Sequence, residues 1–315
     1  MCYIHRQIII FEIFTKGIDM TNLRVALEWF LNPDHLPFLI AEEKGWFAEA
    51  GLNISLIEPK EHFDAFEAFA ANELEIAITE PIHLLQDLSQ GQVLRGFARF
   101  LHTNGGVMVL EKSGITRPRE MAGKRIQYPG APGPGGPAII NTMVMADGGE
   151  SSEYVPVNNG FLHTDALERD IADAATLVFY NFEVVEAYHK GLSPKMFALK
   201  DYGVPDFCQL ILVTTPEILE EQKTALTTFV QILRRGIDFV KQNRTEAASI
   251  YWKRTGGDPE DVLGNAIFDA TVPCFTHDLG MSQDYYQILA DWLIETKQVD
   301  DIPGLDACWT NHFAY

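Results

Sequence analysis

The stretch 206-DFCQLILVTT-215 is an apolar run rich in strand-forming residues. A second run of this kind, 105-GGVMVLEKSG-114, precedes it along the chain. Strands and helices alternate both before and between these two runs. We therefore predict two α/β lobes, joined by one strand that leaves the first lobe and another that crosses back.

The alternation in each predicted lobe defines the fold class. The strand-like runs 23–30, 52–59 and 75–79 are separated by segments of helical periodicity, and Pro81 stands at the favoured first position of a helix. The chain is mostly helical from Pro216 onward. Such alternation predicts parallel-rich sheets with right-handed crossovers. We expect lobe 1 to comprise 20–108 and 214–315, and lobe 2 to comprise 109–213.

Size, charge and cysteine content exclude several classes of protein. The 315 residues suffice for two domains with a sizeable core. A formal net charge of −20 argues against nucleic acid and anionic membrane surfaces as partners, while it permits a cationic or amine-rich ligand. The cysteines show neither CxxC spacing nor a cluster with histidine, so we expect unpaired thiols and no metal site.

The first 19 residues, MCYIHRQIIIFEIFTKGID, differ from the rest of the chain. Their apolar segment is short, contains Glu12 and is followed by no small-residue cleavage site, so it predicts neither a signal peptide nor membrane insertion. We interpret residues 1–19 as an extension or a misassigned start before Met20. The chain as written is expected in the cytoplasm, and a periplasmic location is expected if the start is misassigned.

The residues that follow the predicted strands are rich in aromatic and carboxylate side chains. Open α/β sheets bind ligands at the carboxyl ends of their strands. Aromatic rings can stack on a flat ligand, and a carboxylate can pair with both the exocyclic amine and a protonated ring nitrogen of an aminopyrimidine. For each residue taken alone there is another explanation, since an aromatic residue can belong to the core and an acidic residue can be solvated or cap a helix. The strand ends offer Trp29, Phe30, Asn32, His35, Glu80, Tyr128, Phe179, Phe182, Glu183, Tyr202 and Asp206.

The segment 128-YPGAPGPGGP-137 is expected to shape the wall of a cleft between the lobes. It is not a P-loop, because it lacks the Gly-Lys-Ser/Thr ending and its prolines remove backbone donors. Its glycines permit close approach of the backbone to a ligand. No nucleophile motif of the GxSxG or HExxH type is present in the sequence.

Three segments, 26-ALEWFLNPDHLPFLIAEEKGWFAEAGLNISLIEP-59, 123-GKRIQYPG-130 and 201-DYGVPDFCQLILVTT-215, resemble one branch of the type II periplasmic binding proteins. That branch binds pyrimidine precursors and also includes the fungal thiamine-pyrimidine synthases. The resemblance extends from Leu23 to about Gly257, and its most specific piece is similar to bacterial binding proteins for formylaminopyrimidine. It implies the two-lobed type II fold with two crossover strands.

The resemblance implies a non-enzymatic protein that holds a 4-aminopyrimidine thiamine precursor, of the formylaminopyrimidine or hydroxymethylpyrimidine type, between its lobes. Such proteins serve salvage or transport, and the partner that the family implies is an ABC permease. No cofactor is expected. The predicted ligand-binding residues are Trp29, Asn32, His35, Glu80, Tyr128, Gly130, Asn181, Glu183 and Asp206.

Within that set, Trp29 and Tyr128 are expected to flank the ring, and Glu183 to pair with its amine face with help from Asn181. Asn32, His35 and Glu80 are expected to complete the polar contacts. Asp206 is expected near the hinge.

The synthases in the same branch imply an alternative centred on His83. They resemble self-sacrificing enzymes that build the pyrimidine from pyridoxal phosphate and their own histidine, and His83 falls at that position. The alternative is therefore a hydroxymethylpyrimidine phosphate synthase that uses pyridoxal phosphate, iron and His83.

Three features of this chain favour a binding protein over that enzyme. The lysine that holds pyridoxal phosphate is replaced by Thr79, which cannot form a Schiff base. The glycine-rich loop carries no lysine, and the cysteine-rich run associated with iron is reduced to Cys208. We expect His83 to be a wall or solvated residue, off the buried stripe of Ile82, Leu85 and Leu88.

Overall fold

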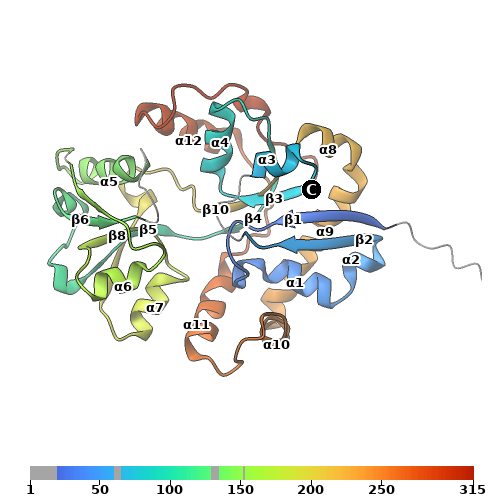
Figure 1. Ribbon diagram of the computed structural model, residues 1–315, viewed down its shortest axis with the longest axis horizontal. Helices are drawn as coiled ribbons and strands as arrows, with labels where there is room; N and C mark the ends of the chain where they lie inside the picture. The colour runs from blue at the N-terminus through green and yellow to red at the C-terminus, as the bar shows by residue number, and fades with distance from the viewer. Residues whose placement is uncertain (1–19, 60–64, 129–134, 152) are drawn as a thin grey trace, which may run out of the picture.

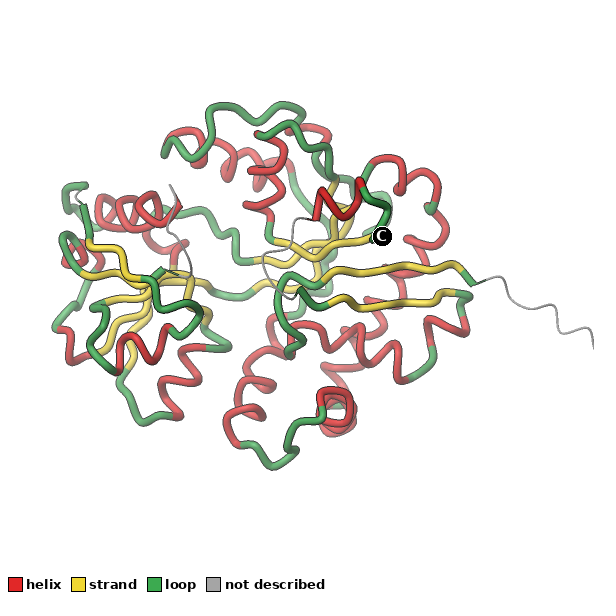
Figure 2. Tube along the Cα trace, viewed as in Figure 1, coloured by secondary structure: helices red, strands yellow, loops and turns green. Residues whose placement is uncertain are grey.

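The computed structural model describes residues 20–59, 65–128, 135–151 and 153–315. They form two α/β lobes that lie side by side, each with a central sheet covered by helices on both faces (Figures 1 and 2). The expected two-lobed α/β fold is confirmed.

The first lobe is built on a sheet of strand order β2-β1-β3-β10-β4. Strands β1, β2 and β3 are mutually parallel, and β10 is antiparallel to both of its neighbours, so β4 runs in the direction of the first three. The strands are β1 (Thr21–Ala26), β2 (Leu52–Ile57), β3 (Ile76–Thr79), β4 (Arg95–His102) and β10 (Gln209–Thr214).

Helices from both ends of the chain cover the first sheet. Helices α3, α4 and α12 lie on one face, whereas α1, α2, α10 and α11 lie on the other (Figure 1). They are α1 (Leu36–Glu43), α2 (Trp46–Glu49), α3 (Ala65–Ala70), α4 (Pro81–Ser89), α8 (Pro216–Glu221), α9 (Lys223–Gln242), α10 (Arg244–Thr255), α11 (Val262–Thr271) and α12 (Gln283–Glu295).

The second lobe is built on a sheet of strand order β7-β6-β8-β5-β9. Here β5 is the antiparallel strand. The strands are β5 (Gly105–Leu110), β6 (Arg125–Gln127), β7 (Val155–Val157), β8 (Ala174–Phe179) and β9 (Pro194–Ala198). Helix α5 (Gly135–Ala146) lies on one face, and α6 (His163–Glu168) and α7 (Glu183–His189) lie on the other (Figure 1).

The lobe boundaries predicted at 108/109 and 213/214 fall inside or at the end of strands and need correction. Strand β5 belongs wholly to the second sheet, where its first residue, Gly105, pairs with Phe179. Strand β10 belongs wholly to the first sheet, where Gln209 pairs with His102. Pairing in each sheet begins at the first residue of β5 and of β10. The chain therefore changes lobes before these strands, at residues 103–104 and 199–208.

The largest apolar cluster of the first lobe joins α1 to α9. The ring of Phe38 packs against Phe100 of β4 and Phe229 of α9, with centroid distances of 5.3 and 5.9 Å. Gly236 allows α9 to approach this closely, because a Cβ atom there would collide with the carbonyl group of Pro37. The packing of α1 on α9 fixes the position of the segment that follows β1.

We therefore expect Gly236→Ala to lower the free energy of unfolding by about 1–3 kcal/mol, since the added methyl group overpacks a backbone contact. Urea denaturation would measure this loss. Gln231→Ala, at an exposed position of the same helix, is the control and should be close to neutral. Equal stabilities of the two variants would contradict this account of α9.

Candidate functional site

The segment after β1 forms a tight turn that buries two of the predicted site residues. Asn32 and His35 are fully enclosed. The Asn32 side chain accepts a hydrogen bond from the Asp34 amide at 2.7 Å, and the Asn32 amide donates to His35 Nδ1 at 3.2 Å. Since Nδ1 is an acceptor there, Nε2 carries the proton and faces the Glu28 carboxylate at 3.1 Å. These bonds hold Glu28 and Asp34 in place.

Asn181 connects the two lobes. It follows β8 in the second lobe and is buried. Its side-chain oxygen accepts a hydrogen bond from the Thr103 hydroxyl at 2.8 Å, and its Nδ2 donates to the Thr271 hydroxyl at 2.9 Å. Thr103 lies in the first crossing between lobes, and Thr271 ends α11. Asn181 therefore joins the second lobe to the crossing and to a C-terminal helix at one point.

Three carboxyl groups from different strand ends hold protons unusually tightly. Burial and the nearby Glu28 carboxylate raise the pKa of Asp34 to about 7 and that of Glu80 to about 8. Burial raises the pKa of Glu183 to about 7, although its carboxylate accepts a hydrogen bond from the Phe179 amide at 2.8 Å. Glu183 also acts on Asp34, so the groups share one electrostatic environment. We call Glu28, Asp34, Glu80 and Glu183 the carboxyl cluster.

Asp34 has an unused acceptor. Its side chain is about nine-tenths buried, and its Oδ1 atom has no hydrogen-bond partner among the described residues. A buried carboxylate oxygen without a donor is costly. The carboxyl cluster therefore favours a ligand that brings positive charge or several N–H donors.

Aromatic side chains from both lobes meet beside the carboxyl cluster. The ring of Trp29 packs against Phe30 at 4.2 Å and against Phe161 and Phe182 of the second lobe at 5.7 and 5.9 Å. Burial and the charge of Glu80 raise the pKa of Tyr128, which places Tyr128 on the Glu80 side of the site. Phe161 is a residue that the sequence analysis missed.

Asp206 lies in the second crossing between the lobes, as expected. Its Oδ2 atom faces His102 Nε2, at the end of β4, at 2.9 Å. The two crossings also pack closely elsewhere, since a Cβ atom on Gly105 would collide with the Cys208 sulfur. Asp206 thus has a structural partner in the hinge, and its contact with a ligand stays a prediction.

His83 lies in the first turn of α4 and is exposed. Ile82, Leu85 and Leu88 are buried, so His83 is off the buried stripe, as predicted. Thr79, the last residue of β3, is partly buried. No group of three or more His, Cys, Asp or Glu side chains within the described ranges is arranged to hold a metal ion. Gly130 lies outside the described residues.

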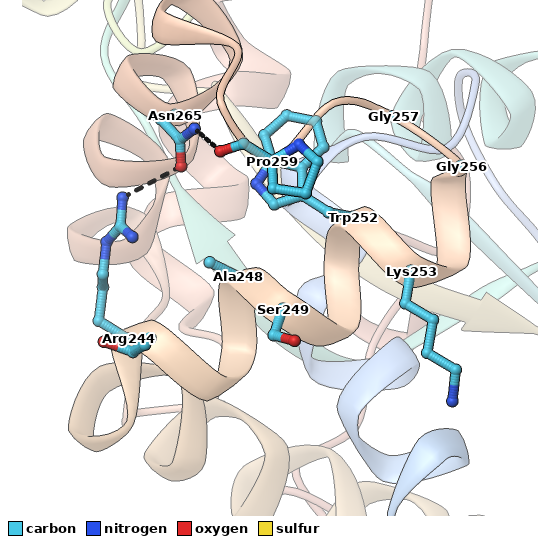
Figure 3. A pocket seen from close by; sticks show the side chains of 10 residues that line it. Arg244, Ala248, Ser249, Trp252, Lys253, Gly256, Gly257, Pro259 and Asn265 are labelled. Carbon is cyan, nitrogen blue, oxygen red and sulfur yellow. Dashed lines mark hydrogen bonds between the residues drawn. The ribbon is translucent and has the colours of Figure 1, made fainter.

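A surface hollow of about 550 Å³ lies elsewhere, along α10 and the turn after it (Figure 3). None of the predicted site residues lines it. Two of its cationic side chains, Arg244 and Lys253, are already paired with Asp269 and Glu43. We therefore assign the candidate site to the junction between the lobes.

The chain has the two-lobed α/β fold of the periplasmic binding proteins. The alkanesulfonate-binding protein SsuA from Xanthomonas axonopodis, solved with MOPS bound, superposes with a TM-score of 0.70 over 92% of this chain and 98% of that chain, at 12% sequence identity. That similarity concerns the fold alone. None of the helices in the described part of the chain is long and apolar enough to cross a membrane.

The chain belongs to the NMT1/THI5-like family, whose model matches residues 32–247. It is 25% identical to the 4-amino-5-hydroxymethyl-2-methylpyrimidine phosphate synthase of Legionella pneumophila, over 93% of this chain and 92% of that protein. It is 26% identical to the formylaminopyrimidine-binding protein of Halalkalibacterium halodurans, over 73% of this chain and 70% of that protein. The relatives of this chain thus include a protein named as a synthase and a protein named as a binding protein.

The pKa of Glu80 leads to a prediction on stability. The unfolded chain releases this proton near pH 4.5, whereas the folded protein keeps it to about pH 8. The folded state therefore binds more protons in that window, and the stability contributed by Glu80 declines as pH rises through it.

We expect Glu80→Gln, which mimics the protonated side chain, to have a melting temperature close to that of the wild type at pH 5 and above it at pH 8. Differential scanning fluorimetry at the two pH values would show this. Glu111→Gln, at an exposed position, should follow the wild type at both values. A Glu80→Gln protein that also follows the wild type at pH 8 would contradict the assignment.

Proposed function

We propose that this chain binds a 4-aminopyrimidine thiamine precursor, of the formylaminopyrimidine or hydroxymethylpyrimidine type, between its lobes for salvage or transport. The observation that carries the proposal is the carboxyl cluster, three of whose members have raised pKa values, beside aromatic rings from both lobes. The formylaminopyrimidine-binding relative supports the choice of ligand.

The chemistry of the cluster suits an aminopyrimidine. Such a ring has an exocyclic amine next to a ring nitrogen, which together form a planar edge that a carboxyl group can match with two hydrogen bonds. A carboxyl group that is protonated near neutrality can donate to the ring nitrogen, and an ionised one can accept from a protonated ring. Glu183 is the proposed partner of this edge, with Asn181 beside it at the end of β8.

The remaining predicted residues have proposed roles around the ring. Trp29 and Tyr128 would flank it, and Glu80 would meet its other polar groups. Asn32 and His35 would act through the turn that holds Glu28 and Asp34. An ABC permease is the proposed partner for transport, by analogy with the periplasmic-binding-protein class.

A synthase is the second candidate, because the Legionella relative of that name aligns over 93% of this chain. The described residues do not fit pyridoxal phosphate at the position of Thr79. Thr79 offers no amine that could form a Schiff base with the cofactor. We therefore assign no reaction step to His83.

We expect the purified chain to bind hydroxymethylpyrimidine or formylaminopyrimidine with one-to-one stoichiometry in isothermal titration calorimetry. Glu183→Ala should weaken binding about tenfold or more, since it removes both hydrogen bonds to the planar edge of the ring. Trp29→Ala should weaken it by a similar factor through lost stacking. Glu111→Gln is the control. Unchanged affinity in both site variants would refute this assignment of the site.

The synthase candidate has its own test. A pyrimidine auxotroph that expresses this chain should fail to grow without added pyrimidine if the chain only binds its ligand. Growth with the wild-type chain that is lost on His83→Asn would instead establish synthase activity. The control is soluble expression of the wild type and of the His83→Asn variant.

A further inference from the structure

The segment 158-NNGFL-162, between β7 and α6, is a turn of fixed shape. The buried side chain of Gln127, at the end of β6, donates to the Gly160 carbonyl and accepts from the Asn159 amide, both at 2.7 Å. The Asn158 side chain accepts from the Gly160 amide at 2.9 Å. Gly160 has a φ of +57°, a conformation that favours glycine.

This turn exposes two large apolar side chains in succession. Phe161 is 64% exposed and Leu162 is 62% exposed. A turn held by a buried glutamine has little freedom to fold these side chains inward. The exposure of these two side chains therefore follows from the fixed shape of the turn. Contact with another molecule would remove their apolar surface from water.

Phe161 is directed toward the junction between the lobes. Its ring lies 5.7 Å from that of Trp29, with the two planes tilted by 46°. Trp29 follows Glu28 of the carboxyl cluster, and it also contacts Phe182, which directly precedes Glu183. Phe161 thus stands beside the same site as the carboxyl groups, on the second lobe, opposite a tryptophan of the first.

We propose that Phe161 is a specificity-determining residue that covers one face of a planar ring while Trp29 covers the other, which leaves Tyr128 at the edge of the ring on the Glu80 side. The inference rests on the proposed function. The two rings contact each other in this structure, and a ligand ring between them requires a separation of about 7 Å, twice the contact distance of stacked atoms. Phe161 is the member of the pair that is mostly exposed, so a ligand ring would bury the larger part of its surface.

The consequence is selection for ring shape beyond hydrogen bonding. Acetamidine has the same N–C–N donor edge as a 4-aminopyrimidine but lacks the aromatic ring. The carboxyl cluster can pair with either molecule, whereas the full face of an aromatic ring offers Phe161 and Trp29 a larger contact than the small amidinium cation does. The contribution of Phe161 should therefore be clearly larger with hydroxymethylpyrimidine than with acetamidine.

The test compares Phe161→Ala and Phe161→Leu with Leu162→Ala, an equally exposed neighbour on the same turn. Calorimetry with hydroxymethylpyrimidine should show binding about tenfold weaker in both Phe161 variants and nearly unchanged in Leu162→Ala. The dissociation constant of acetamidine, determined from its competition with hydroxymethylpyrimidine, should change by a much smaller factor in the Phe161 variants and stay the same in Leu162→Ala. Equal melting temperatures would establish that the exposed substitutions leave the fold intact.

Two results would overturn the inference, and they differ. If both Phe161 variants bind hydroxymethylpyrimidine as tightly as the wild type does, Phe161 has no role in specificity, while the proposed function stands. A wild-type protein that binds no pyrimidine would remove the proposed function and this inference with it.

Discussion

The close packing of the two crossings between lobes is the constraint on which the rest of the structure depends. Gly105 and Cys208 come so near that the first must lack a side chain, and His102 faces Asp206 beside them. Each crossing then supplies the antiparallel strand of a sheet, β5 in the second lobe and β10 in the first. The C-terminal helices add contacts on either side, through Thr271 to Asn181 and through Trp292 to Thr142. The strand ends of both lobes are thereby held facing a common junction.

The junction concentrates acidic side chains in a buried place, where their pKa values are raised. Burial of several carboxyl groups together is unfavourable unless they are protonated or meet positive charge. Hydrogen bonds within the turn from Asn32 to His35 nevertheless hold Glu28 and Asp34 at the junction. These bonds require that the polar side chains of Asn32 and His35 be buried. Such an arrangement contributes little to stability by itself. The arrangement is instead suited to binding a ligand, namely a flat ring that carries N–H donors or a positive charge.

The relatives of this chain include one named as a synthase of the thiamine pyrimidine and one named as a binding protein for formylaminopyrimidine. Here the residue at the end of β3 is Thr79, and the residue after it is a carboxylic acid. This contrast shows why fold similarity alone does not assign the activity.

The sequence by itself determined the class of fold. Alternating apolar runs and the proline at the start of α4 follow local periodicity, which can be read from the chain. The rule that strand ends gather at one edge predicted that Trp29, Asn181 and Glu183 lie at the same junction, and their role as a ligand site stays a prediction. Strands β4 and β9 were missed because arginines interrupt the first and Pro194 begins the second. Only the tertiary structure decided where the chain changes lobes, how Thr103 and Thr271 meet Asn181, and that Phe161 stands opposite Trp29. Those contacts join residues far apart in the chain, so packing between the lobes sets them and local pattern does not.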